Sequence, residues 1–399
     1  MRAALSRVWL PVLAVAASLL VHWTIAAVAS ALPQISPLND VNLYAQWVDR
    51  GLAINRWPGT NEPGVYPLLA LVPMIIARLF DTTDAIHGWL WFITALDTVA
   101  LLALVRRPNG WRAGAYWLAF LLLLGPVAIG RIDAVAAALD VFVVITVLAG
   151  RERLGMALAT AGAWIKIWPL SAALAVLATR RSRAELVRMI GAAAAVSLGV
   201  MAVGIALGGN QNMFSFLWLM GDRGIQIESP IALPWMWGAH LGWGDSSTYF
   251  DANVITYQVV GPGAAVVSKL MLPALGVALA ITAWLGVKAA AVDPRQALVL
   301  TSLTAVLDLI VFNKVGSPQF ESWLAVPLIA GVLLGLPSWR LPLIGGLAIA
   351  ALTQWVYPLN YDAVVATEPF ALAVLTARNL LLIAMLAWAN LRLSSAARP

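Results

Sequence analysis

The chain has 399 residues, of which 61% are hydrophobic and only 11% are charged. A soluble domain is about half apolar and about a quarter charged, so this composition excludes a soluble globular protein and predicts an all-α polytopic integral membrane protein. The formal net charge of +6 comes mostly from arginines between apolar runs, which is typical of membrane topology rather than of nucleic-acid binding. The absence of cysteine excludes disulfides and thiolate catalysis, and three scattered histidines argue against a histidine-rich metal site.

The first apolar stretch, residues 8–32, has the charged start and small-residue end of a signal peptide. It is longer than the apolar core of a signal peptide, which has about 7 to 15 residues, so we predict a retained first span. Further apolar runs lie near residues 66–80, 86–105, 111–129, 134–149, 154–178, 186–207, 264–287, 296–312, 320–336, 341–357 and 367–390. Together these runs predict about 10 to 12 transmembrane segments.

The positions of the basic residues predict which loops face outward. From residue 179 onward, every basic cluster falls where the positive-inside rule places the cytoplasm. We therefore expect the loops at 208–263, 313–319 and 358–366 to lie on the non-cytoplasmic side. The chain is predicted to be one membrane domain with an N-terminal module (1–207), a large outer loop (208–263) and a C-terminal module (264–399).

The first half of the chain allows two topologies. Strict alternation of the runs would place the arginine clusters at 106–112 and 151–153 outside, against the positive-inside rule. If instead the run 66–80 does not cross, and the run 154–178 bends back at Lys166 and Pro169, all these clusters lie inside. We favour the second topology, because it also brings Lys166 to the outer side with the other polar motifs.

The first outer loop, predicted at residues 32–64, contains PLNDVNLYAQWVDR. Asp40, Tyr44 and Trp47 are spaced at i, i+4 and i+7, so they share one face if residues 40–54 form a helix lying in the membrane interface. One interpretation is that Asp40 only caps this helix; the other is that it is a functional carboxylate. Glu62 adds a second outward carboxylate after a Pro- and Gly-rich turn.

Two motifs place charged residues next to or within apolar runs. GPVAIGRIDA contains Arg131 and Asp133, which could simply shield each other as an ion pair at the end of a span. GAWIKIWPL places Lys166 inside an apolar run, where a lysine needs an anionic partner or a water-filled cavity. A structural lysine that extends toward the interface is the alternative.

Polar residues also gather in two later outer segments. GDRGIQIESP offers Arg223, Gln226 and Glu228, and FNKVGSPQFESW offers Lys314, Ser317, Gln319 and Glu321. Each segment alone could be a solvated loop, but carboxylates and cations from five segments are predicted to share one membrane face. Three further acids, Asp97, Asp140 and Asp308, fall within spans, where a functional role and structural hydrogen bonding are equally compatible with the sequence.

These residue types suit the transfer of a sugar from a lipid-linked phosphate. We find no serine–base triad, metal-ligand spacing, phosphate-binding glycine loop or dinucleotide fingerprint in the sequence. A carboxylate at the membrane surface can act as general base on an acceptor hydroxyl, and Lys or Arg can stabilise the departing phosphate without a metal. Trp and Tyr side chains can stack on sugar rings.

The order of these motifs (NDVNLYAQW, EPGVYP, GPVAIGRIDA, WIKIWPL, RGIQIES, NKVGSPQFESW) resembles actinobacterial membrane glycosyltransferases of the GT-C fold. It is most similar to the glycosyltransferase 87 family, which includes polyprenyl-phosphate-mannose-dependent mannosyltransferases of cell-envelope synthesis. The resemblance implies a multi-pass plasma-membrane enzyme with its active site on the non-cytoplasmic face, a lipid-linked donor and a glycolipid or glycan acceptor, with no cofactor, metal or nucleic acid.

By this resemblance Asp40 matches the catalytic aspartate of the first outer loop. Arg131, Lys166 and Lys314 are the implied phosphate contacts, and Gln226, Glu228 and Gln319 the implied sugar or acceptor contacts. The remaining expected substrate-binding residues are Tyr44, Glu62, Asp133, Arg223 and Ser317.

Two other classes of function stay open from the sequence. In a transporter or flippase of lipid-linked sugars, Lys166, Asp97, Asp140 and Asp308 would form a translocation path and Asp40 would be structural. The lack of an internal repeat between the two halves weakens that interpretation. In a non-catalytic assembly subunit, none of these polar residues would be needed for turnover.

Overall fold

The computed structural model describes residues 2–32, 37–179, 182–219, 223–252 and 254–398. Residues 33–36 of the expected first outer loop lie outside the described residues. The same holds for residues 220–222 and 253 of the large outer loop at 208–263, which is called the second outer loop below. It also holds for Arg180 and Arg181 of the basic cluster that follows residue 178.

Long apolar helices dominate the fold, as the composition predicts. Within the described residues, seven helical segments are long and apolar enough to cross a membrane. They belong to α1 (Arg2–Ser30), α4 (Ala85–Val105), α10 (Arg183–Ala206), α13 (Ala264–Val292), α14 (Pro294–Val311), α16 (Arg340–Gln354) with the π-helical turn η4 (Trp355–Leu359), and α18 (Pro369–Ala396). The chain is therefore a helical, multi-pass membrane protein.

Shorter helices complete the bundle, and several are interrupted. They are η1 (Leu68–Ala70), α3 (Leu71–Phe80), α5 (Gly110–Leu124), α6 (Pro126–Ile129), α7 (Asp133–Leu148), α8 (Glu152–Ala163), α9 (Leu170–Ala178), η3 (Pro318–Leu324) and α15 (Ala325–Leu334). The predicted break within 154–178 is confirmed: α8 ends at Ala163 and α9 begins at Leu170, directly after Pro169. Helices α8 and α9 pack against each other, so this run forms a hairpin with Lys166 in its turn.

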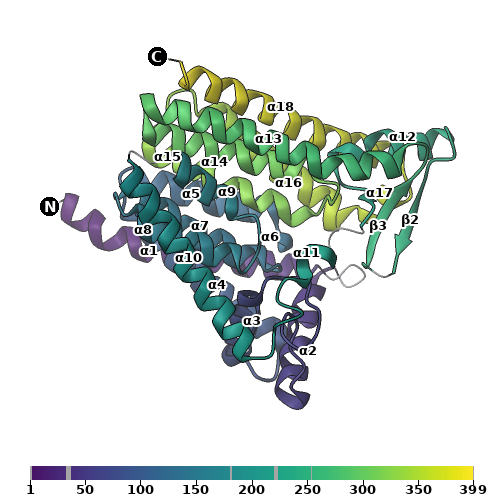
Figure 1. Ribbon diagram of the computed structural model, residues 1–399, viewed down its shortest axis with the longest axis horizontal. Helices are drawn as coiled ribbons and strands as arrows, with labels where there is room; N and C mark the ends of the chain where they lie inside the picture. Colours follow the sequence, from purple (N-terminus) through teal and green to yellow (C-terminus); the bar gives the residue numbers. More distant parts are fainter. Residues whose placement is uncertain (1, 33–36, 180–181, 220–222, 253, 399) are drawn as a thin grey trace.

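The arginine clusters lie at one end of the bundle. Asn109, in the turn between α4 and α5, donates a hydrogen bond to the carbonyl of Leu333, close to Arg340. Ala178, at the end of α9, lies against Gly286 near the end of α13, and the hairpin brings the start of α8 to the same end. Figure 1 shows the start of α1 and the end of α18 at this end too, on the left. This arrangement agrees with the second of the two expected topologies.

The second outer loop folds into a small cover at the opposite end of the bundle, on the right of Figure 1. It contains α12 (Leu233–Leu241), a 3-10 turn η2 (Pro230–Ala232) and three antiparallel strands, β1 (Ile225–Gln226), β2 (Ser247–Asp251) and β3 (Thr256–Val260). Helix α11 (Ser215–Leu219) belongs to the same loop but lies in the middle of Figure 1, where Ser215 bonds to Gly64. The strand order is β1-β3-β2, with Tyr249 opposite Gln258. The all-α expectation holds for the helical bundle, to which this loop adds a small sheet. A short helix, α17 (Tyr361–Val365), lies beside the sheet.

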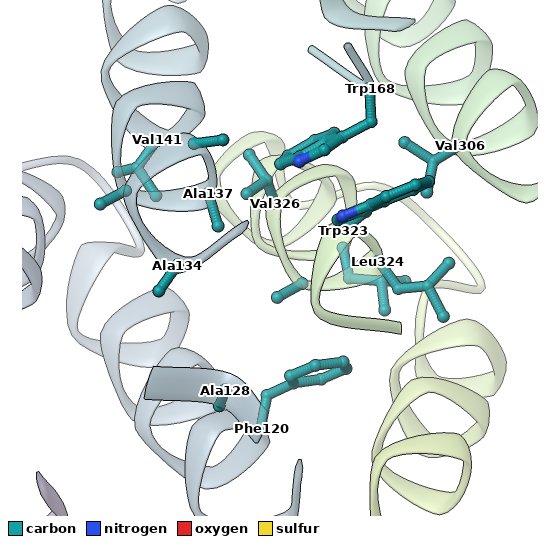
Figure 2. Packing of buried hydrophobic residues seen from close by; sticks show 14 of the residues in the cluster. Phe120, Ala128, Ala134, Ala137, Val141, Trp168, Val306, Trp323, Leu324 and Val326 are labelled. Carbon is teal, nitrogen blue, oxygen red and sulfur yellow. The ribbon is translucent and has the colours of Figure 1, made fainter. Parts of the chain in front are cut away.

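Small and aromatic residues together pack the centre of the bundle. Ala134, Ala137 and Val141 on α7 are buried, and such small side chains allow neighbouring helices to approach closely. Figure 2 shows Trp168, from the turn before α9, beside Trp323 of η3; their rings are stacked with centroids 5.4 Å apart. This stack joins the α8–α9 hairpin to η3, immediately beneath the polar residues of the outer end.

Candidate functional site

Asp40 is presented at the start of α2 (Asn39–Ile54), the helix that the i, i+4, i+7 spacing predicts. The residue that precedes the helix is Leu38, and no side chain caps its free amides. The capping interpretation of Asp40 is therefore wrong. Its carboxylate oxygen Oδ1 lies 2.6 Å from Nη1 of Arg131, and the Asp40 side chain remains 34% exposed, so it is both held in place and accessible.

The GRID segment at residues 130–133 packs on the start of α2. Gly130 leaves room for Leu38, because a Cβ atom at this position would lie 2.6 Å from Cδ2 of Leu38. The main-chain amide of Ile132 donates a hydrogen bond to the Tyr44 hydroxyl at 3.1 Å. Tyr44 is buried and therefore fixes the first outer loop against the bundle.

Arg131 and Asp133 do not pair with each other, contrary to one expectation from the sequence. Arg131 binds Asp40 and donates through Nη2 to the hydroxyl of Tyr357 at 3.1 Å. Its Nε is buried and, within the described part of the chain, has no hydrogen-bond partner. Asp133 instead lies 3.5 Å from Nζ of Lys166 and accepts a hydrogen bond from Trp323 Nε1 at 2.8 Å.

Lys166 has the anionic partner that its sequence position requires. It is buried beside Asp133, so the alternative in which it extends to the interface is wrong. Its ammonium also lies 4.6 Å from the centre of the Tyr66 ring, a favourable cation–π contact. The ring of Tyr66 packs edge to face against the rings of Tyr44 and Trp47 of α2, with an angle of 71° between the ring planes in each pair.

Asp40, Arg131, Lys166 and Tyr66 lie close enough for electrostatic interactions within the group. Burial raises the pKa of the Tyr66 phenol; the field of Lys166 opposes this shift and the field of Asp40 adds to it. Tyr66 therefore stays neutral and able to donate a hydrogen bond. Burial alone would lower the pKa of Arg131, but Asp40 and Tyr357 overcome that effect and raise it, so the guanidinium stays charged.

A second buried charge cluster borders the first. Arg378 of α18 donates to the Glu228 carboxylate at 3.0 Å and to the Glu228 main-chain carbonyl, and lies 3.8 Å from Glu321. Burial raises the pKa of Glu228, while Arg378 and, more weakly, Arg131 lower it, which places this cluster within reach of the field of Arg131. Tyr357 lies close enough to both Asp40 and Glu228 to interact electrostatically with each of them.

Arg378 is the main residue that the sequence analysis missed. A signal existed, because Arg378 is a charged residue inside the apolar run 367–390, where an ionised side chain needs a partner. Tyr66 and Tyr357 were also missed. They stand at the ends of the apolar runs 66–80 and 341–357, where aromatic residues are common at a membrane interface and give no spacing rule that points to the site.

Two loops that supply predicted residues pack directly against each other. The amide of Gln226 donates to the carbonyl of Lys314 at 2.9 Å, and the Ser229 hydroxyl donates to the carbonyl of Asn313 at 2.7 Å. Gly316 lies against the main chain of Ser229, where no Cβ atom would fit. The expected convergence of these outer segments is therefore observed.

The remaining predicted residues lie around or away from this group. Arg223 is partly buried on the second outer loop and interacts electrostatically with Tyr66 and Asp251. Ser317 and Gln319 lie at the start of η3, where their carbonyls accept hydrogen bonds from Phe320 and Ser322.

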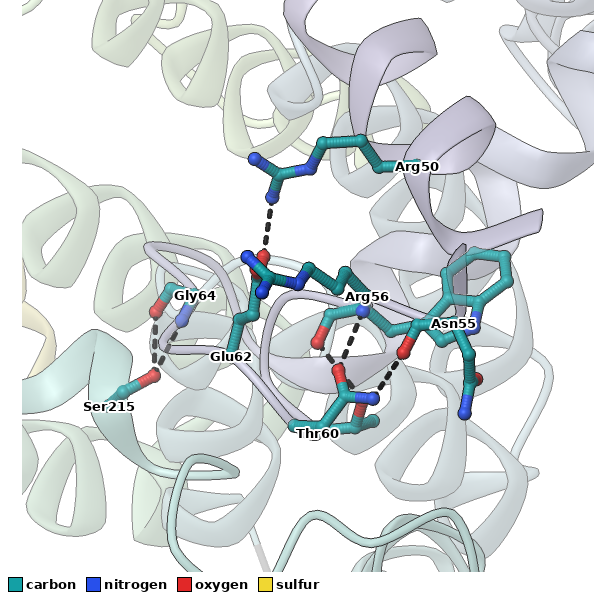
Figure 3. A network of polar contacts seen from close by, with 9 residues as sticks. Arg50, Asn55, Arg56, Thr60, Glu62, Gly64 and Ser215 are labelled. Atoms are coloured by element: carbon teal, nitrogen blue, oxygen red, sulfur yellow. Dashed lines mark hydrogen bonds and ion pairs between the residues drawn. The ribbon is translucent and has the colours of Figure 1, made fainter. Parts of the chain in front are cut away.

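Glu62 belongs to a different network. Figure 3 shows it bound to Arg50 and Arg56, at 2.5 Å and 3.3 Å. Arg50 is ten residues beyond Asp40 on α2, or about 15 Å along a helix. Glu62 is therefore not among the side chains that contact Asp40.

The acids within the spans are separate from one another. Asp97 lies 3.0 Å from Nε2 of His22, between α4 and α1, and Asp308 accepts a hydrogen bond from Thr282 at 2.6 Å, between α14 and α13. Asp140 is buried on α7, and its Oδ1 has no hydrogen-bond partner among the described residues. The structural hydrogen bonds considered for these acids are thus present for Asp97 and Asp308.

The described residues contain no group of three or more His, Cys, Asp or Glu side chains that could hold a metal ion. The site instead combines an accessible carboxylate, the cations Arg131 and Lys166, and the rings of Tyr44, Tyr66 and Tyr357. Such a group can accept a proton at Asp40 and bind an anion beside it. The sequence matches no protein-family model, and it matches no curated protein.

Proposed function

We propose that this protein is a membrane glycosyltransferase that moves a sugar, with mannose as the first candidate, from a polyprenyl-phosphate donor to a cell-envelope glycolipid or glycan. The observation that carries the proposal is the position of Asp40. It is a partly exposed carboxylate, fixed by Arg131 at the end of the bundle opposite the arginine clusters. The positive-inside rule supports the assignment of that end to the outer face of the plasma membrane, which is part of this proposal.

In the proposed reaction Asp40 takes the proton from an acceptor hydroxyl. The acceptor oxygen then forms a bond with the anomeric carbon of the donor sugar, while the bond from that carbon to the phosphate oxygen breaks. The electron pair of the broken bond stays on the phosphate. A single displacement of this kind inverts the anomeric centre.

Arg131 and Lys166 are the proposed phosphate-binding residues. Nε of Arg131 is a buried donor without a partner in the described part of the chain, and a phosphate oxygen would satisfy it. A phosphate bound there competes with Asp40 for the guanidinium and so frees the carboxylate for the acceptor hydroxyl. Lys166 adds a second positive charge close to Tyr66 and Asp40.

The membership of the GT-C fold and of the glycosyltransferase 87 family is part of this proposal. It rests on the order of the sequence motifs, on the helical membrane fold, and on the placement of Asp40 directly after the first span. Gln226, at the end of β1, and Glu228, two residues further along the chain, are candidate positioning groups for the sugars.

The test compares sugar transfer by two variants of α2. The purified protein in lipid is offered polyprenyl-phosphate mannose, arabinose and glucose with envelope glycolipids as acceptors. Loss of a general base typically costs about 10²- to 10⁴-fold, so Asp40→Asn should lower transfer by that factor. Asp49→Asn is the matched control, because Asp49 lies on the same helix and is ion-paired with Arg78, away from the site.

Transfer by the wild type and by Asp49→Asn, with a large loss in Asp40→Asn, would support both the reaction and the base. Equal transfer by all three proteins would refute the role of Asp40. Transfer by none of them from any donor would refute the glycosyltransferase proposal.

A further inference from the structure

Four aromatic rings form a continuous series from the outer sheet to the candidate site. Phe250 of β2 lies 5.1 Å from Tyr257 of β3, and Tyr257 lies 6.0 Å from Tyr361 of α17, measured between ring centroids. Tyr361 lies 5.1 Å from Tyr357 of η4. The guanidinium carbon of Arg131 lies 5.9 Å from the Tyr357 ring, so the series ends one residue from Asp40.

These rings lie at the edge of a hydrophobic cluster, against which the three tyrosines pack. Phe250 is 50% exposed on β2, an edge strand of the sheet, and the three tyrosines are each partly exposed. Within the described part of the chain, no residue forms a hydrogen bond with the hydroxyl of Tyr257 or Tyr361, and neither oxygen is among the buried polar atoms without partners. Both hydroxyls are therefore free to bind a ligand.

Rings with free hydroxyls in a row match the chemistry of a linear glycan. A sugar ring has an apolar face that packs on an aromatic ring, and hydroxyls at its edge that exchange hydrogen bonds with groups such as tyrosine. The steps between the rings are comparable with the spacing of successive sugars in a linear chain.

We propose that Phe250, Tyr257, Tyr361 and Tyr357 form an acceptor track that binds a linear oligosaccharide and delivers its end to Asp40. This inference rests on the proposed glycosyl transfer and makes it more specific. The acceptor is a chain of several sugars, either a free glycan or the glycan part of a glycolipid, rather than a single sugar or a lipid alcohol.

The test measures binding, without any donor, by saturation-transfer NMR on the full-length protein in lipid nanodiscs. The probes are linear oligosaccharides of mannose, arabinose and glucose with one and with six sugar residues. The wild type should bind at least one six-residue probe about 10-fold more tightly than its single sugar. Phe250→Ala should weaken that binding about 2- to 10-fold, and Phe250→Trp, which keeps an aromatic face, should retain it.

Phe80→Ala is the matched control. Phe80 is also 50% exposed and packs on one ring, Phe92, with centroids 6.0 Å apart, but it lies on α3 outside the track. Equal binding of short and long probes, or equal losses in Phe250→Ala and Phe80→Ala, would overturn the track even if the transfer assay with glycolipids succeeds. Length-dependent binding that is lost only in Phe250→Ala would support it, and would do so even if no donor gave transfer.

Discussion

Several buried charges in this protein occur in matched sets, although Asp140 and Asp308 are buried without an ion-pair partner among the described residues. Asp133 has Lys166, Asp97 has His22, and Arg378 serves both Glu228 and Glu321. The reason is energetic, because an ionised side chain removed from water costs several kcal/mol unless an opposite charge or hydrogen bonds replace the water. Asp40 differs from these acids in remaining 34% exposed, which is why it is the carboxylate that a substrate can reach.

Arg378→Met is predicted to destabilise the protein. The substitution leaves Glu228 and Glu321 buried side by side without their shared cation, and the loss of one partner from a buried ion pair costs about 3–5 kcal/mol. The free energy of unfolding in detergent, measured by denaturant titration, should fall by this amount. Arg392→Met is the control on the same helix, since Arg392 lies over the exposed side of Trp388, and its loss should cost under about 1 kcal/mol.

The energetic cost of an unpaired buried charge explains which parts of the site could be predicted from the sequence. It identified Lys166 as a residue that needs an anion, but could not say which acid of the chain provides it. Asp133 is 33 positions earlier, and only the bend between α8 and α9 brings the two together. The pairing of Arg131 with Asp40 rather than with Asp133 likewise depends on how the GRID segment packs on α2.

At the scale of elements, the site is built from short and interrupted pieces. It joins the start of α2, the turn of the α8–α9 hairpin, η3, and the two loops at residues 225–229 and 313–317. Irregular backbone at the end of a bundle can face water and substrate, whereas continuous helices within the membrane must satisfy their own hydrogen bonds. The contact between the two loops fixes Gln226 and Ser229 against residues 313–316.

Gly316→Ala is predicted to disrupt that contact. A Cβ atom at residue 316 would overlap the main chain of Ser229, which cannot move aside as a flexible side chain could. We expect a loss of about 1–3 kcal/mol in stability and reduced transfer. Gly276→Ala on α13 is the control, because a Cβ atom there meets nothing within 4 Å, and helix propensity favours alanine. If the two variants have the same melting temperature, the loops are not in this contact.

Element prediction succeeded where a pattern was local. The helix expected at 40–54 is observed at Asn39–Ile54, and the bend expected at Lys166 and Pro169 is observed. The sheet of the second outer loop was missed. Its strands, STYFD and TYQVV, are rich in β-branched and aromatic residues, but each has only five residues and its pairing is set by distant contacts.

The exposed arginine clusters and the candidate site lie at opposite ends of the molecule. The arginine-bearing turns gather at one end, and Asp40, Lys166, Glu228 and the outer sheet at the other. The acids within the spans do not form a path between these ends, because Asp97 and Asp308 are bonded in separate helix pairs. The relay of acids that a transporter is expected to use is therefore not continuous between Asp97 and Asp308.

The separation of charges predicts the outcome of a topology experiment. The chain has no cysteine, so single cysteines can be introduced and labelled with a membrane-impermeant maleimide on intact cells. Arg107→Cys and Arg340→Cys, both at exposed positions of the arginine end, should be protected until the membrane is opened. Ser247→Cys, exposed on β2, should react at once. Labelling of Arg107→Cys but not Arg340→Cys would contradict the shared end that Asn109 and Leu333 define, because the alternating topology places these turns on opposite faces.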